Sequence, residues 1–314
     1  MKLKLIRGLY NLRPEHRGSV ATIGNFDGVH RGHQAVIAQL REQADALGCS
    51  ATVITFEPLP HEYFLGDQAP GRLTPLREKL VLFDRLGIDQ LLCLPFNASL
   101  ANLSAEDFIQ QVLVDGLHIR RLVVGDDFRF GKGRSGDFAL LQRTGRAQGF
   151  EVVDTRTHVC DEGERISSTR IRKALAQGDF ALAEQLLGRP FTMSGRVIHG
   201  DKRGRTIGFP TANIRANHPV SPLRGVFAVH VEGLGNGVAN VGTRPTFDGK
   251  HYLAEIHLLD FTGDLYGQRI TVQWQKKLRD ERKFENFQAL VAQIEKDIAA
   301  ARQYFASRPR RATE

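Results

Sequence analysis

The sequence predicts an α/β domain with a doubly wound parallel sheet, followed by an antiparallel β-barrel with a terminal helix. Its 314 residues exceed the roughly 100–200 residues of one domain. Strand-like and helix-like segments alternate over residues 1–150, which favours a parallel sheet that binds ligands at the carboxyl ends of its strands. Beyond residue 190, short apolar runs separated by Gly and Pro are typical of a barrel.

Hydrophobic spacing predicts the elements of the first part. Four apolar segments are predicted strands: residues 20–23, 51–56, 122–125 and 150–154. Residues 91–94 are apolar as well. Apolar residues three and four apart predict helices within residues 36–47, 76–86, 108–113 and 171–187. Ser104 and Asp107 form a capping-box pattern before the third of these helices.

The second part shows a different pattern of short strands and one final helix. The predicted strands are residues 193–198, 225–231, 237–241, 253–259 and 270–274. Residues 287–305 carry apolar side chains at helical spacing. Because the pattern changes between residues 188 and 191, we expect two domains, 1–188 and 189–314.

Composition excludes several classes of protein. With 41% hydrophobic residues, the chain can form ordinary cores and is not a disordered protein. No apolar run approaches the roughly 20 residues of a membrane span, and residues 1–18 lack the apolar core of a secretory signal. Cys49, Cys93 and Cys160 lie far apart, which favours inert thiols over a disulfide framework or a zinc site. We expect a cytoplasmic protein without a membrane partner.

The net charge of +8 and the pI near 9.6 fit either nucleic acid or small phosphorylated substrates. The cations are dispersed along the chain apart from a basic tail at residues 308–311. No RNA-recognition, KH or zinc signature accompanies them. We therefore expect small phosphorylated substrates and no nucleic-acid partner.

Two glycine-rich segments imitate nucleotide-binding motifs. Residues 131–136, GKGRSG, match GxGxxG but come after several strand–helix units, whereas a dinucleotide fingerprint follows the first strand. Residues 195–202, GRVIHGDK, nearly spell a P-loop, but Asp201 separates Gly200 from the lysine and no Ser or Thr follows. Neither segment is interpreted as a nucleotide site.

The strongest local signal is residues 24–33, GNFDGVHRGH, between a predicted strand and a predicted helix. Backbone amides at a helix N-terminus bind anions, and Gly28 and Gly32 allow the backbone to approach a phosphate. His30 and His33 can aim at the same phosphate oxygens, where negative charge develops during phosphoryl chemistry. One histidine alone would favour a structural, hydrogen-bonded residue; two beside a glycine favour function.

His-x-Gly-His at this turn resembles the nucleotidyltransferase superfamily, which transfers an adenylyl or cytidylyl group and releases pyrophosphate. Residues 166–172, ISSTRIR, are similar to its second motif, in which a hydroxyl-rich helix start and a cation hold the β- and γ-phosphates of ATP. Taken alone, that segment could be an ordinary helix cap with a basic first turn.

The whole of residues 24–33, GNFDGVHRGH, points to one family within this superfamily. Together with TFEP at residues 55–58 and GDDFRFG at 125–131, it resembles the N-terminal module of the bacterial bifunctional riboflavin kinase/FAD synthetases, which joins AMP to FMN. The resemblance implies adenylyl transfer for Asn25, His30 and His33; nucleotide phosphate binding for Gly24, Phe26, Gly28, Gly32, Ser167, Ser168, Thr169, Arg170 and Arg172; and flavin or metal contacts for Asp127 and Phe128.

A second candidate site lies in residues 204–213, GRTIGFPTAN. If the segment is extended, Thr211 and Asn213 face the same way and offer two hard oxygen ligands for Mg²⁺. Alone, the segment could also be a turn with polar decoration. Residues 240–247, 255–261 and 278–284 follow it in order, and together they resemble the riboflavin kinase module.

This second resemblance implies a six-stranded barrel and a set of kinase residues. By this resemblance, we expect Glu255 to be the general base toward the riboflavin 5′-hydroxyl and Arg279 to bind flavin phosphate. We expect Thr211 and Asn213 to bind Mg²⁺–ATP, and Lys202 and Gly208 to contact ATP. A hydroxyl attacking a γ-phosphate needs a carboxylate within reach. If Glu255 shares a face with Leu253 and that face points into the barrel, the acid is buried; an exposed strand carboxylate is the alternative.

The expected function is therefore phosphorylation of riboflavin to FMN, followed by adenylyl transfer from ATP to FMN, with Mg²⁺ as cofactor. The expected ligands are riboflavin, FMN, FAD and ATP. Another phosphate acceptor, such as phosphopantetheine or nicotinamide mononucleotide, is the main rival. A nucleic-acid-binding role and a silent site are further alternatives, and the oligomeric state is left open.

Overall fold

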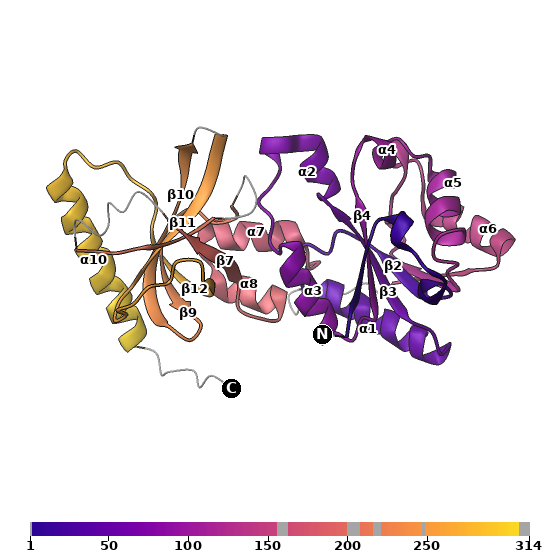
Figure 1. Cartoon of the computed structure of the whole chain (residues 1–314), viewed down its shortest axis with the longest axis horizontal. Coiled ribbons are helices and arrows are strands. Elements are labelled where there is room, and N and C mark those ends of the chain that lie inside the picture. The colour runs from indigo at the N-terminus through magenta and orange to yellow at the C-terminus, as the bar shows by residue number, and fades with distance from the viewer. Residues whose placement is uncertain (1, 156–162, 200–207, 216–220, 247–248, 308–314) are drawn as a thin grey trace. The chain divides into compact units, whose positions relative to one another are not determined.

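The computed structural model describes residues 2–155, 163–199, 208–215, 221–246 and 249–307 (Figure 1). The chain forms two compact units. The first comprises Met1–Ala69 and Thr74–Ser167, and the second comprises Pro70–Leu73 and Ser168–Glu314. Sequence positions 168–187, which form two helices, therefore belong to the second unit rather than to the first.

The first unit contains a six-stranded parallel sheet, which confirms the predicted α/β class. Its strands are β1 (Lys4–Arg7), β2 (Val20–Ile23), β3 (Ala51–Glu57), β4 (Gln90–Pro95), β5 (Arg121–Val124) and β6 (Glu151–Asp154). They run in the order β1-β4-β3-β2-β5-β6. Strands β3 and β4 are added on one side of β2, and β5 and β6 on the other, so the strand order reverses between β2 and β5. Ligands of open α/β sheets bind at such a switch point, outside the carboxyl ends of the strands.

Strand β1 precedes the segment that hydrophobic spacing identified as the first strand. It pairs in parallel with β4, at the edge of the sheet. Of its four residues only Ile6 is buried, because an edge strand needs little apolar surface. The sequence pattern therefore gave no signal there.

Helices cover both faces of this sheet (Figure 1). They are α1 (Arg31–Ala46), α3 (Leu76–Arg85), α4 (Ala98–Ala101), α5 (Ala105–Phe108), a π-helical turn over Ile109–Val114, and α6 (Phe138–Gln148). A further short helix, α2 (Pro60–Leu65), follows β3. Side chains alternate across a strand. Val20 accordingly packs with α1 and α3 on one face, and Ala21 packs with α5, the π-helical turn and α6 on the other.

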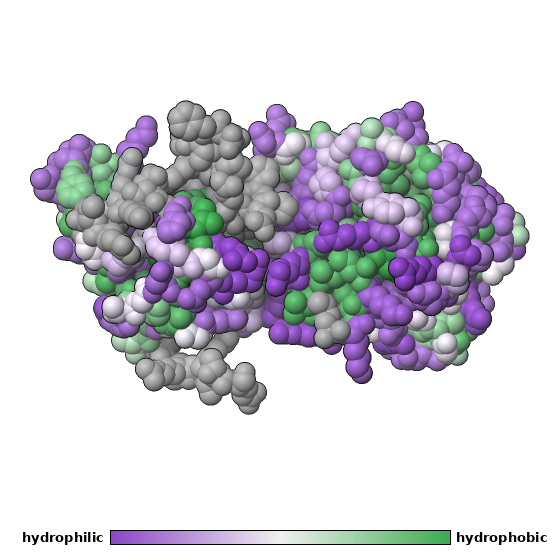
Figure 2. All heavy atoms as spheres, in the orientation of Figure 1, coloured by the Kyte–Doolittle hydropathy of each residue, from purple (hydrophilic) through white to green (hydrophobic). Residues whose placement is uncertain are grey.

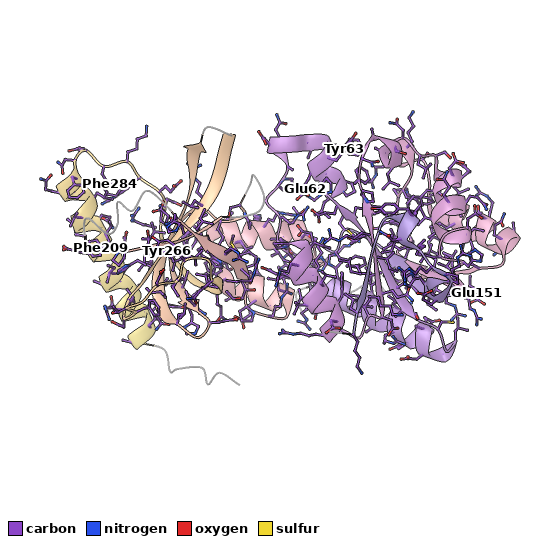
Figure 3. The ribbon with its side chains drawn as sticks, viewed as in Figure 1. Glu62, Tyr63, Glu151, Phe209, Tyr266 and Phe284 are labelled. Carbon is purple, nitrogen blue, oxygen red and sulfur yellow. The ribbon has the colours of Figure 1, made fainter. Side chains whose placement is uncertain are left out.

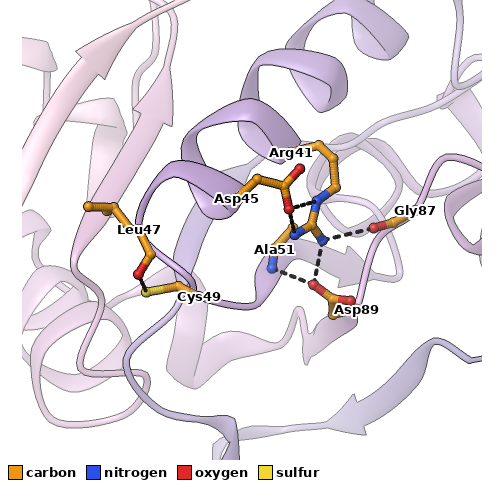
Figure 4. A network of polar contacts seen from close by, with 7 residues as sticks. All are labelled: Arg41, Asp45, Leu47, Cys49, Ala51, Gly87 and Asp89. Atoms are coloured by element: carbon orange, nitrogen blue, oxygen red, sulfur yellow. Dashed lines mark hydrogen bonds and ion pairs between the residues drawn. The ribbon is translucent and has the colours of Figure 1, made fainter.

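A polar network fixes the amino ends of β3 and β4 (Figure 4). Asp89 accepts hydrogen bonds from Arg41 Nη1 at 2.6 Å and from the Ala51 amide at 2.8 Å. Arg41 also donates to the Gly87 carbonyl and to Asp45, and this pairing lowers the pKa of Asp45. This network lies at the amino ends of the strands, whereas ligands of such sheets bind at the carboxyl ends.

The second unit contains the predicted antiparallel barrel, closed in the order β10-β11-β8-β7-β12-β9. Its strands are β7 (Thr192–Ile198), β8 (Ala212–Arg215), β9 (Gly225–Val231), β10 (Gly235–Thr246), β11 (Gly249–Leu258) and β12 (Arg269–Arg279). Helix α10 (Phe287–Ala306) packs along β9, β10 and β12. Strand β8, which contains the end of the GRTIGFPTAN segment, was not among the predicted strands.

Two helices, α7 (Ser168–Gln177) and α8 (Phe180–Leu187), precede the barrel. The single helix predicted over residues 171–187 was wrong. Gly178 has a φ of 79°, which ends α7 in the left-handed conformation that glycine favours. Asp179 then caps α8 by accepting a hydrogen bond from the Leu182 amide at 2.9 Å.

The surface shown in Figure 2 is predominantly hydrophilic, with apolar patches between the charged side chains. None of the described helices combines the length and the apolarity that crossing a bilayer requires.

Candidate functional site

The loop that follows β2 is conformationally strained. Phe26 and Val29 have positive φ angles of 47° and 41°, which cost side-chain-bearing residues on the order of 1–3 kcal/mol each. Both side chains are buried, at 2% and 0% exposure. Asp27 is buried as well, and its carboxylate accepts a hydrogen bond from the Thr74 amide at 3.0 Å. Strain held by surrounding packing is typical of functional loops.

The strained loop places two histidines at the start of α1. His30 is the N-cap residue, and its Nδ1 accepts a hydrogen bond from the His33 amide at 3.3 Å. The two imidazoles are stacked, with centroids 3.6 Å apart and planes 16° apart. A side chain at Gly32 would lie 3.2 Å from the His30 ring. Gly32 therefore leaves room for His30, and both rings lie at the positive end of a 16-residue helix.

The surroundings of His33 favour its neutral imidazole form. Burial, followed by the positive charges of His30 and Lys79, lowers the pKa of His33 well below its ordinary value. The residue as a whole is half-buried, but its Nδ1 is shielded from solvent and has no hydrogen-bond partner among the described residues. A neutral ring can still donate one N–H to a phosphate oxygen.

The depressed pKa of His33 predicts acid sensitivity of the first unit. Below the ordinary histidine value of about 6.5 the unfolded chain binds a proton that the folded chain refuses. The contribution of neutral His33 to the free energy of unfolding is therefore fully present above that pH. It falls as the pH decreases toward the pKa of His33 in the folded chain. We expect His33→Gln to weaken this pH dependence. The pH dependence is measured by urea unfolding at several pH values. Unfolding is followed by pulse hydrogen exchange at one fixed pH, read on peptides from β2 and α1. If His33→Gln leaves the pH dependence unchanged, the prediction is contradicted.

Ile166, the first residue of the ISSTRIR motif and part of the first unit, lies near the same helix start. The carbonyl of Ile166 lies 3.7 Å from where a Gly32 side chain would begin. Ser167 and Ser168 are half-buried, and Thr169 is exposed. Ser168 begins α7, which belongs to the second unit. Within that unit Arg172 Nε donates to the Gly71 carbonyl at 2.7 Å; Arg170 is half-buried.

The segment after β5 lies at the other side of the switch point, because β5 pairs directly with β2. Asp127 is exposed and forms an ion pair with Arg165 at 2.6 Å. Phe128 is half-buried and stacks on Phe130, with centroids 5.5 Å apart. Arg165 was not predicted as a site residue; its position one residue before the ISSTRIR motif was the available signal.

The barrel has a cavity of about 350 Å³ at the predicted Thr211–Asn213 segment. Thr211, Asn213, Phe261, Asp264 and Tyr266 are among its lining residues, and Phe209 and Tyr266 are labelled in Figure 3. His257 Nδ1 donates to the Pro210 carbonyl at 2.9 Å, and its ring meets Phe209 edge to face at 5.7 Å. His257 thus fixes the backbone just before Thr211, a role that the sequence analysis missed.

The strand register shows which face of the barrel wall carries the side chain of Glu255. Glu255 pairs with Asn213 of β8 on one side and with Asn240 of β10 on the other. Directly paired residues share a face and have Cβ atoms about 4.5–5.5 Å apart. Ala254 and Ile256 are buried on the opposite face. Glu255 is therefore half-buried in a polar row with Asn213, outside the apolar core of the barrel.

Arg279 is engaged by the terminal helix. Its Nε and Nη2 donate to the carboxylate of Asp297 at 2.8–3.1 Å, and Nη1 donates to the Asp280 carbonyl at 3.0 Å. Asp297 is 5% exposed and also accepts from Gln293. The guanidinium lies 5.7 Å from the ring of Phe284, and Phe284 is labelled in Figure 3. Every nitrogen of the Arg279 guanidinium thus has a protein partner.

Gly208 is exposed and has a φ of 84°, and a Cβ added there would meet no described residue within 4 Å. Lys202, the other predicted ATP contact, lies outside the described residues.

The Arg279–Asp297 pair predicts a large effect on barrel stability. Asp297→Ala would leave a largely buried guanidinium without its carboxylate, which we expect to lower the free energy of unfolding of the second unit by about 2–3 kcal/mol. Asp260→Ala, which removes the exposed partner of Arg302, is the control and should cost less than about 1 kcal/mol. Trp274, the single tryptophan, is buried in this unit, so its fluorescence in a urea titration reports the barrel alone.

Comparisons with known families match each part of the chain separately. The family model described as FAD synthetase matches residues 12–170. The model described as riboflavin kinase matches residues 187–305.

Individual relatives match almost the full length. A Pseudomonas fluorescens bifunctional riboflavin kinase/FMN adenylyltransferase is 53% identical, over 96% of this chain and 97% of that protein. Its Escherichia coli K12 counterpart is 52% identical, over 96% and 98%. A crystal structure from Streptococcus pneumoniae, described as a macrolide-efflux protein, has a TM-score of 0.77 at 30% identity, over 96% of this chain and 99% of that one. By these matches, the chain belongs to the family of bifunctional riboflavin kinase/FMN adenylyltransferases.

Proposed function

We propose that the loop after β2 is the adenylyl-transfer site and that the barrel cavity with its neighbouring polar row is the kinase site. The protein is bifunctional: it phosphorylates riboflavin to FMN and adenylylates FMN to FAD. The observation that carries the first assignment is the stacked pair of His30 and His33 at the N-terminus of α1. We assign the two activities to domains 1–188 and 189–314.

At the first site the FMN phosphate attacks the α-phosphorus of ATP in line, and pyrophosphate leaves. No covalent intermediate with the protein is needed, so the chain contributes positioning and electrostatics. His30 and His33 donate to phosphate oxygens on which charge develops. The amides of Gly28 and Gly32, with Asn25, Gly24 and Phe26, complete the anion site at the helix start.

Further predicted residues are proposed to serve the same reaction. Ser167, Ser168, Thr169, Arg170 and Arg172 are proposed to hold the β- and γ-phosphates through hydroxyls and charge-assisted bonds. Asp127 and Phe128, after the neighbouring strand β5, are proposed to lie on the flavin side. The ion pair of Asp127 with Arg165 supports this position, because it joins that strand end to the segment preceding the serines.

At the second site Glu255 orients the 5′-hydroxyl of riboflavin and accepts its proton. Its partner in the strand register, Asn213, lines the cavity beside Thr211. A hydroxyl and an amide oxygen are hard donors that suit Mg²⁺, and both are presented by one ordered segment. When bound there with ATP, Mg²⁺ would neutralise charge on the transferred phosphoryl group.

No group of three or more His, Cys, Asp or Glu side chains is arranged for a metal within the described ranges. We propose that the ion is held by Thr211 and Asn213 together with substrate phosphates, as Mg²⁺ commonly is. Lys202 and Gly208 are proposed ATP contacts. Arg279 is proposed to approach flavin phosphate through its terminal nitrogens while Asp297 orients it.

A time course of flavin products tests the assignment. Purified protein is incubated with riboflavin, ATP and Mg²⁺, and flavins are separated by chromatography. We expect FMN to appear first and FAD to follow. FMN without FAD would contradict the first site. If neither forms, pyrophosphate release with phosphopantetheine or nicotinamide mononucleotide would favour a different acceptor.

A further inference from the structure

Lys79 is a fully buried cation directed at the adenylyl-transfer loop. It lies in α3, its exposure is 0%, and its Nζ donates a hydrogen bond to the Asn25 carbonyl at 2.7 Å. Burying an ammonium group is costly unless strong hydrogen bonds compensate. An apolar residue at the same position of α3 would complete the core without that cost. The Asn25 carbonyl supplies one of the hydrogen bonds that the burial of Lys79 requires.

The Asn25 carbonyl is a sensitive point of this loop. The next residue, Phe26, adopts the left-handed conformation. Because a peptide unit is planar, holding the Asn25 carbonyl also fixes the direction of the Phe26 N–H. Thr55 Oγ1 is also near this carbonyl, at 3.5 Å, which is the long limit of a hydrogen bond. The Lys79 ammonium is thus the stronger of these two contacts.

The segment that carries Lys79 contacts the loop at a second point, and the charge of Lys79 acts on His33. The Thr74 amide, two residues before α3, donates to the buried Asp27 carboxylate at 3.0 Å. The charge of Lys79 also helps to lower the pKa of His33. Two residues of the strained loop, Asn25 and Asp27 with Phe26 between them, are therefore tied to residues 74–79.

We propose that Lys79 is a positioning residue for adenylyl transfer: its ammonium group clamps the Asn25 peptide and thereby fixes the strained turn that presents His30 and His33. The inference rests on the proposed role of that loop. It assigns no direct contact with ATP to Lys79, because the side chain is fully buried. Loss of the clamp should therefore affect the rate of the chemical step more than the binding of FMN.

The test compares Lys79→Met with Lys277→Met in the full chain. Lys277 Nζ also donates to a backbone carbonyl, that of Ala176 at 3.2 Å, but in the second unit. We expect Lys79→Met to lower kcat for conversion of supplied FMN to FAD on the order of 10- to 100-fold, with KM for FMN changed less than about threefold. Lys277→Met should leave this reaction unchanged. NMR titration of the His33 ring should show a raised pKa in Lys79→Met, because the Lys79 charge helps to lower it; the loss in kcat at nearly constant KM is the result that a purely structural role would not produce.

Other outcomes separate the inference from the function on which it rests. Full adenylyl transfer in Lys79→Met, while His30→Ala is inactive, overturns the role of Lys79 alone. Full activity in both overturns the proposed site. If Lys79→Met fails to fold, shown by loss of hydrogen-exchange protection in β2, Lys79→Arg decides, because it keeps the charge and the donor. A folded Lys79→Arg whose kcat for FAD formation lies within about tenfold of wild type supports the clamp, and a folded Lys79→Arg that has lost adenylyl transfer overturns it.

Discussion

Replacing His30 with alanine is expected to lower kcat for FAD formation by about 10²–10³-fold, the cost of losing one preorganised donor to a developing oxyanion. The change also removes the N-cap acceptor of α1, which costs about 1 kcal/mol of local stability. Phosphorylation of riboflavin should proceed at the wild-type rate, because the described residues of the kinase site lie in the second unit. Chromatography of a riboflavin reaction should therefore show accumulation of FMN without FAD.

His16→Ala is the matched control for this variant. His16 is buried, and its Nδ1 accepts a hydrogen bond from the Arg13 amide at 3.1 Å, as His30 does from His33. It lies in a short 3₁₀ turn before β2, away from the start of α1. If the loss in His30→Ala reflects only the removal of a buried imidazole and its bond to a backbone amide, both variants should lose similar activity. If His30 donates to phosphate, only His30→Ala loses adenylyl transfer, and FAD formation within twofold of wild type would contradict that role.

The first site could be located from the sequence because its elements are local. A short strand, a glycine-containing turn and two histidines at a helix start occupy residues 20–33, and no distant contact is needed to place them. Lys79 could not be found in this way. It lies in an amphipathic helix, where a lysine normally faces solvent, and only the packing of α3 against the loop brings its Nζ to Asn25.

The second site shows a different limit. In the segment LAEIHL, Leu253 suggested that Glu255 shares an apolar face, yet Ala254 and Ile256 are the buried residues. The alternation of side chains along the strand does not show which face points into the barrel, because apolar residues occur at both odd and even positions. Closure of the barrel with Ala239 and Val241 of β10 on the inner face decides it. Similarly, the role of Arg279 depended on Asp297, 18 residues away on a helix whose docking no motif specifies.

Glu255→Ala is expected to reduce riboflavin phosphorylation by about 10²–10⁴-fold, the contribution of a positioned general base. In a loose transition state the carboxylate mainly orients the hydroxyl, so we expect the loss in kcat with a smaller change in KM for riboflavin. Glu232→Ala, which removes an exposed carboxylate just after β9, is the control. Supplied FMN should still be converted to FAD by both variants. Because Glu255 lies outside the apolar core beside Asn213, the substitution should leave the Trp274 unfolding transition nearly unchanged. A destabilised barrel with proportionate loss of activity would instead indicate a structural carboxylate, and wild-type kinase activity would remove Glu255 from the mechanism.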